Sequence, residues 1–114
     1  MSKALIVLHA PPDVRDCRAL TALRLAGALL ADSKEVCLFL VEEGARLADP
    51  KLDADNHCRA LFYELLDVGL DVQVCGGTMT KFGWDQAYPL PGISRSSMKA
   101  LSTLMTEADE IATF

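Results

Sequence analysis

Cys75 is the residue of this chain whose surroundings best suit covalent chemistry. It follows the apolar run 70–74 and precedes Gly76 and Gly77, so a strand can end and a short helix can begin there. Backbone amides at a helix start, left uncovered by glycines, favour a thiolate over a thiol. A thiolate is the form that attacks a sulfane sulfur or a disulfide. The alternative is a buried cysteine that packs as a small apolar side chain.

Two further side chains are candidates for assisting this cysteine. His9 follows the first apolar run, and an imidazole beside a thiol can accept its proton or hydrogen-bond to it. A lone loop histidine, however, is more often simply solvated. Thr78, together with Gly76 and Gly77, is a candidate for stabilising an anionic sulfur.

The other cysteines carry weaker chemical signals. Cys37 lies inside an apolar run and Cys58 continues the apolar stripe of a helix, so both are expected in the core. Cys17 is near a helix start and is open to exposure. No C-x2-C spacing occurs, so neither a zinc site nor any other metal or cofactor is expected. No secretory signal precedes the first strand, which predicts a cytoplasmic chain with reduced thiols.

Composition narrows the class of protein. The chain has 114 residues, of which 51% are hydrophobic and 24% charged, which predicts one globular domain spanning 1–114. Its formal net charge of −5 disfavours a nucleic-acid partner, because an acidic surface repels phosphates. No apolar run approaches the roughly 18 residues needed to span a bilayer, so no membrane partner is expected.

The elements that must position these residues alternate along the chain. Apolar runs predict strands over 4–8, 35–41, 70–74 and 110–114. Helical spacing predicts helices over 14–31 after an Asp13 cap, from a cap at Asp55 or Asn56 to Gly69, and over about 95–107 after a cap at Ser94 or Ser96. The segment 42–56 lacks an apolar period and is predicted to be a loop, whereas 86–92 is irregular or a short strand.

This order predicts an α/β fold: a three-layer open parallel sheet of about five strands with helices on both faces. Ligands of such sheets bind beyond the carboxyl ends of the strands, where the strand order switches. His9, the run Glu42-Glu43-Gly44, and Cys75 each follow a predicted strand. In a flavodoxin-like strand order the first and third strands are neighbours, which would place His9 and Cys75 in one crevice.

Four segments, in order, resemble the DsrE/DsrF-like family, which includes the TusD-type sulfur relay subunits. The family has a strand, a Pro-Pro turn and a helix with an ALRLA core, a strand with an acidic-Gly turn, a Cys-Gly motif, and a Ser-Met helix with a closing strand. The matching segments are KALIVLHAPPDVRDCRALTALRLAGALL (3–30), VCLFLVEEGARLA (36–48), VCGGTMTKFGW (74–84) and PGISRSSMKALSTLMTEADEIATF (91–114).

The resemblance implies homo-oligomers, trimers or hexamers, and a persulfide on Cys75 that passes from a sulfur donor protein to an acceptor protein. Two positions depart from the family pattern. Thr78 stands where many members have a second cysteine, so the resemblance does not imply a disulfide mechanism. Phe82 stands where an arginine is common, which removes a cation near the thiolate.

Two functions of different classes follow. The first is an intracellular persulfide carrier, a sulfurtransferase-like role that uses Cys75. The second is a non-catalytic homo-oligomeric module that binds a small molecule or a protein partner at the same crevice. A receiver domain is excluded, because it needs an aspartate where Cys75 ends the third strand. A flavodoxin is excluded, because residues 9–14 lack a hydroxyl- and Gly-rich phosphate loop.

Overall fold

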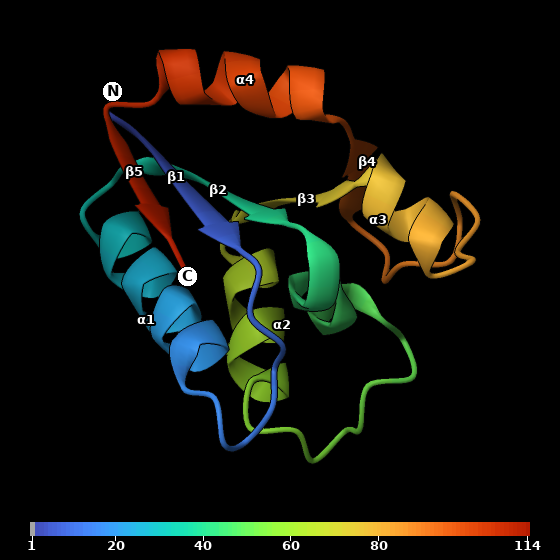
Figure 1. Cartoon of the computed structure of the whole chain (residues 1–114). Coiled ribbons are helices and arrows are strands. Elements are labelled where there is room, and N and C mark those ends of the chain that lie inside the picture. The colour runs from blue at the N-terminus through green and yellow to red at the C-terminus, as the bar shows by residue number, and fades with distance from the viewer. Residues whose placement is uncertain (1) are drawn as a thin grey trace.

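The computed structural model describes residues 2–114, in which five parallel strands form one open sheet with helices on both faces (Figure 1). The strands are β1 (Lys3–Leu8), β2 (Glu35–Leu40), β3 (Asp71–Cys75), β4 (Ile93–Ser96) and β5 (Glu110–Thr113). The helices are α1 (Arg18–Ala31), the 3-10 helix η1 (Glu42–Ala48), α2 (Arg59–Asp67), α3 (Gly76–Lys81) and α4 (Met98–Glu107). The predicted open parallel sheet is confirmed.

The strand order is β4-β3-β2-β1-β5, so the predicted flavodoxin-like order is wrong. Small residues on α1 let α2 pack close beside it, and a Cβ on Gly27 would lie 3.4 Å from Leu65 Cδ2. Both helices therefore cover the same face of the sheet. Because crossovers between parallel strands are right-handed, helices on one face require the chain to advance in one direction, from β1 through β2 to β3.

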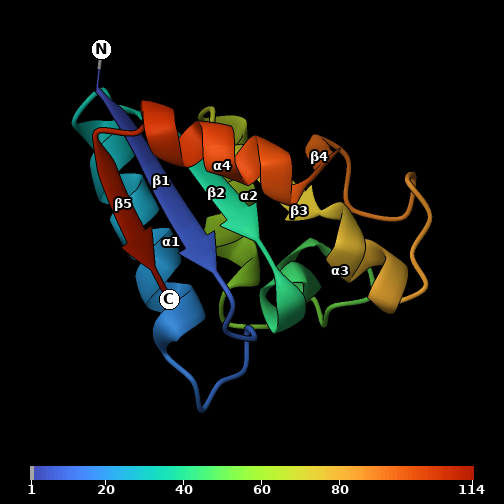
Figure 2. The same cartoon turned by 45° about the horizontal axis from the view of Figure 1, so that its top comes forward.

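The return from β4 to β5 reverses that direction, and the same handedness places α4 on the opposite face. Figure 2 shows α4 lying across the strands, with α1 and α2 behind the sheet. The chain ends beside β1, where β5 pairs Leu5 with Ile111.

Alternating side chains of the central strands build a core on each face. The larger core lies under α1 and α2 and includes Leu38 of β2 and Phe62 of α2, both fully buried. The smaller core lies under α4, and we call it the α4-side core. Its buried members are Leu5, Val7, Cys37, Phe39, Val41 and Cys75.

Several element ends differ from their predictions. The segment Glu42–Ala48 was predicted to be a loop but forms η1, which packs so tightly on β1 that a Cβ on Gly44 would lie 2.1 Å from Leu8 O. Helix α1 begins at Arg18, so Asp13 is not its cap; Asp13 instead pairs with Arg46 at 3.3 Å.

The last strand-to-helix junction also lies later than predicted. Residues Ile93–Ser96 form β4, so neither Ser94 nor Ser96 caps the last helix. Ser97 is the cap of α4, and its Oγ accepts a hydrogen bond from the Ala100 N–H at 3.1 Å.

Candidate functional site

The carboxyl ends of β3 and β4 form the switch point of this sheet. The chain leaves β3 into α3, whose Met79 packs in the larger core, and leaves β4 into α4 on the other face. Ligands of open α/β sheets bind where successive connections diverge in this way. Cys75 is the last residue of β3 and pairs in register with Ser96, the last residue of β4. The sequence thus correctly predicted that this cysteine lies at the carboxyl end of the third strand.

The Cys75 side chain lies in the α4-side core and is 7% exposed. Leu101 and Leu104 of α4 pack against this core. Cys75 is also the N-cap residue of α3. A Cβ on Gly77 would lie 3.7 Å from Cys75 Sγ. The sulfur is therefore covered by α4 and adjoins the backbone of the glycine pair.

Arg95 of β4 brings a cation to the carboxyl end of the sheet, and no motif in the sequence indicated it. A Cβ on Gly76 would lie 2.8 Å from Arg95 Nε, 3.0 Å from Arg95 Nη2 and 3.0 Å from Ser96 O. The guanidinium thus lies against Gly76. Because Arg95 pairs with Val74 of the larger core, its side chain leaves the sheet on the face opposite the Cys75 sulfur. The strand that carries Arg95 was missed, because the serines of Ile93-Ser94-Arg95-Ser96 are typical helix caps.

His9 does not join Cys75 in the way predicted. Strand β2 lies between β1 and β3, so the ends of the first and third strands are not neighbours. The His9 N–H donates to Phe114 O at 2.8 Å, and the side chain is exposed. Its charge has a minor influence on Glu42, whose pKa is lowered mainly by the hydrogen bond and charge of Lys81.

A hydrogen bond between Thr78 and Glu42 connects α3 to the start of η1. Thr78 is buried, and its Oγ1 accepts a hydrogen bond from the Glu42 N–H at 3.0 Å. Glu42 has a positive φ of 51°, a conformation that costs energy in a non-glycine residue. Its carboxylate accepts a hydrogen bond from Lys81 Nζ at 2.7 Å. These contacts join α3 to the first residue of η1, which follows β2.

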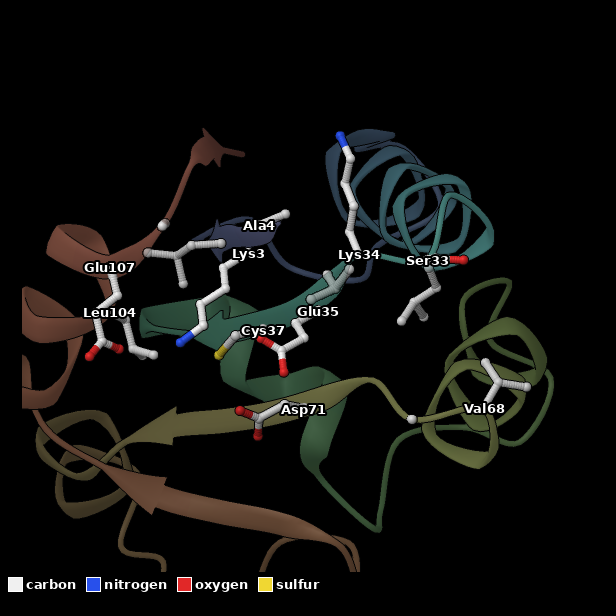
Figure 3. A pocket seen from close by; sticks show the side chains of 15 residues that line it. Lys3, Ala4, Ser33, Lys34, Glu35, Cys37, Val68, Asp71, Leu104 and Glu107 are labelled. Carbon is white, nitrogen blue, oxygen red and sulfur yellow. The ribbon is translucent and has the colours of Figure 1, made fainter. Parts of the chain in front are cut away.

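Cys37 occupies the opposite, amino-terminal edge of the same sheet face. It lines a hollow of about 600 Å³ between the strand starts and the end of α4. Figure 3 shows its sulfur between the side chains of Lys3 and Glu35, with Asp71 close by. Burial, with the charge and hydrogen bond of Asp71, raises the pKa of the Cys37 thiol to about 12. This thiol is therefore neutral at physiological pH.

The remaining two cysteines also have distinct settings. Cys58 is fully buried beside α2, as predicted, and burial raises the pKa of its thiol to about 11. Cys17 is exposed at the start of α1. All four cysteines are free thiols.

Within residues 2–114, no three or more His, Cys, Asp or Glu side chains gather as a metal site would require. Among the same residues, no helix has both the length and the apolar character needed to cross a membrane.

Solved structures with the same fold include the ychN protein from E. coli, with a TM-score of 0.85 and 20% identity over 100% of both chains. The protein MTH1491 from Methanobacterium thermoautotrophicum, described as of unknown function, has a TM-score of 0.79 and 19% identity, covering 98% of this chain and 99% of that one. These likenesses establish the shared fold.

Relatives by sequence include two uncharacterized archaeal proteins. MK0008 from Methanopyrus kandleri is 28% identical over 99 residues, covering 85% of this chain and 82% of that protein. MJ0989 from Methanocaldococcus jannaschii is also 28% identical over 99 residues, covering 85% of this chain and 87% of that protein. The family model for the DsrE/DsrF-like family matches residues 1–114. The chain therefore belongs to the DsrE/DsrF-like family.

Proposed function

We propose that this protein is a persulfide carrier that receives sulfane sulfur on Cys75 and passes it to an acceptor thiol. The observation that carries the proposal is the position of Cys75 at the switch point, as the last residue of β3. Membership of the DsrE/DsrF-like family, whose resemblance implies a persulfide at this cysteine, supports the same residue. Cys37 and Cys58 are poorer candidates, because burial raises the pKa of both thiols.

The transfer proceeds in two displacements. The Cys75 thiolate attacks the outer sulfur of a donor persulfide, the donor S–S bond breaks, and the donor leaves as its own thiolate. Cys75 then carries the outer sulfur as an anionic persulfide. An acceptor thiolate attacks that sulfur, the new S–S bond breaks, and Cys75 returns to its thiolate. Both steps conserve charge and require no added oxidant or reductant.

Because Cys75 is only 7% exposed, the transfer requires an opening on the α4 side. No residue of α4 is fully buried. The half-buried Leu101 and Leu104 of α4, and Ala108 just after the helix, pack against the α4-side core. Elements with few buried apolar contacts open at lower free energy than the rest of a protein. Local displacement of α4 is therefore the proposed route by which donor and acceptor reach the sulfur.

The test is sulfur loading by site in a Cys17→Ser background, which removes the exposed thiol. After incubation with sodium polysulfide, mass spectrometry of the peptides should place one added sulfur on Cys75. Cys75→Ser should abolish loading, whereas the matched control Cys58→Ser, at another buried cysteine, should keep it. Equal loading of several cysteines, or none at Cys75, would refute the carrier function.

The second candidate is a homo-oligomeric binding module without sulfur transfer. Three exposed apolar side chains on α4 and β5 favour it: Met98 at 55%, Met105 at 47% and Ile111 at 46% exposure. We expect Met105→Glu to lower the molar mass measured by light scattering if a second copy covers this surface. A module of this kind would form the oligomer yet take up no sulfur on Cys75.

A further inference from the structure

We infer that the Ser96 hydroxyl donates a hydrogen bond to the terminal sulfur of the Cys75 persulfide and stabilises that anion. This inference rests on the proposed function, because it adds a residue to the site of the same sulfur. It starts from the register of β3 and β4, in which Ser96 pairs with Cys75 (Figure 2). The Ser96 backbone also approaches the residue after the cysteine, since a Cβ on Gly76 would lie 3.0 Å from Ser96 O.

The two paired side chains leave the sheet on the same face. Side chains alternate along a strand, and Ile93 of β4 packs against the larger core under α1 and α2. Ser94 and Ser96 therefore point to the α4 side, where the Cys75 side chain lies in the α4-side core. Neighbouring strands are about 4.8 Å apart, so the hydroxyl and the thiol extend from adjacent positions.

The α4 side of the sheet changes from apolar to polar at this pair. On β1 and β2 it consists of buried apolar side chains that include Leu5 and Phe39. On β3 and β4 the pair before Cys75 is instead Gln73 with Ser94. Cys75 thus lies between an apolar and a polar half of this face. A sulfur anion there has a hydroxyl available as a donor, which an anion surrounded by hydrocarbon would lack.

The Ser96 hydroxyl is not committed to another group of the protein. Ser96 is half-buried, and among residues 2–114 no side-chain hydrogen bond of the structure involves its hydroxyl. The next serine differs, because Ser97 Oγ accepts the Ala100 N–H and caps α4. Ser96 can therefore donate to a new acceptor without breaking an existing contact within the protein.

The added sulfur of the persulfide is the acceptor that this hydroxyl can reach. An S–S bond is about 2.05 Å long, so the terminal sulfur extends beyond Cys75 Sγ by that length. It also carries most of the negative charge of the persulfide, and donors bind charged acceptors more strongly than neutral ones. In residues 2–114 the structure has no hydrogen bond between Ser96 and the unloaded thiol, so the hydroxyl favours the loaded state. The bond transfers no proton, and both displacements stay balanced.

The first test measures how much sulfur each variant holds at equilibrium, in the Cys17→Ser background. Glutathione persulfide and glutathione are supplied at a fixed ratio, and mass spectrometry gives the loaded fraction of Cys75. We expect Ser96→Ala to lower the ratio of loaded to unloaded Cys75 by about five- to tenfold, because it removes a hydrogen bond to an anion. Ser96→Thr keeps a hydroxyl and should keep most of the ratio. The matched control Ser94→Ala, on the same strand and face, should leave it unchanged.

The second test measures iodoacetamide alkylation of unloaded Cys75 in the same variants, with circular dichroism to confirm folding. Ser96→Ala should react at the rate of the parent protein, because its hydroxyl has no bond to the unloaded thiol. A faster rate would show that the substitution opens the α4 layer. The lower loaded fraction would then be a structural effect, and the inference would be overturned.

The outcomes separate this inference from the carrier function. If the parent protein and Ser96→Ala load Cys75 to the same extent, the inference is overturned and the carrier function stands. Equal losses in Ser94→Ala and Ser96→Ala would also overturn it, because the effect would belong to β4 as a whole. If the parent protein takes up no sulfur on Cys75, the carrier function is refuted, and the inference with it.

Discussion

Helices α1 and α2 cover one face of the sheet, and α4 covers the other, with different consequences for the two cores. On the first face, Leu23 of α1 and Phe62 of α2 are fully buried. On the second face no residue of α4 is fully buried, although the strands beneath it contribute buried side chains. Cys75 therefore lies beneath the helix that buries fewer of its own side chains. We expect this layer to open more readily than the layer of α1 and α2.

The largest expected effect is a loss of stability when one apolar side chain is truncated in each helical layer. We expect Phe62→Ala to lower the free energy of unfolding by about 3–5 kcal/mol, because it leaves a cavity in the larger core. Leu101→Ala should cost only about 1 kcal/mol, because this leucine is half-buried. Urea unfolding followed by circular dichroism measures both. Equal losses would mean that α4 is held as firmly as α2.

Cys37, in the α4-side core, makes the stability of the protein depend on pH in the alkaline range. The pKa of Cys37 is raised from its ordinary value of 9.0 to about 12, first by burial and then by Asp71. Between these values the native state keeps a proton that the unfolded chain has lost, so stability falls as pH rises from about 9 to about 12. This group contributes a slope of up to about 1.4 kcal/mol per pH unit.

The Cys37→Val variant should lose that part of the alkaline fall in stability, measured by urea unfolding at several pH values. Asp71→Asn should narrow the pH window, because it removes the charge that adds to the burial effect. Cys17→Ser, at an exposed thiol, serves as the control and should keep the slope of the parent protein. An identical slope in Cys37→Val would show that this thiol titrates alike in both states.

The smallest expected effect concerns access to Cys75. In the Cys17→Ser background, Leu101→Ala should speed iodoacetamide alkylation of Cys75 about fivefold, because a loss of about 1 kcal/mol from the contacts of α4 makes its opening that much more frequent. The alkylation rate of Cys58, which is buried beside α2, should stay the same under native conditions. If both rates rise together, the variant loosens the whole protein and α4 is not a separate layer.

Local patterns in the sequence predicted most of the elements. Each apolar run became a strand, and the helix predicted over 14–31 formed as α1, with Ala19, Leu23 and Ala26 fully buried. Gly69, predicted as the end of the second helix, has the positive φ of 104° that ends α2. These features depend on residues close together in the chain, which is why spacing alone revealed them. The capping residues were harder to place, because Asp13, Asn56 and three serines all fit the same local preference.

The sequence by itself determined that Cys75 lies where a strand ends and is followed by two glycines, since both facts are local. Only the tertiary structure decided what surrounds it. The strand order put β2 between His9 and Cys75, and brought Ser96 and Arg95 of β4 beside the cysteine segment. The physical reason is that α1 and α2 pack together on one face, a long-range contact, and right-handed crossovers then fix which strands become neighbours.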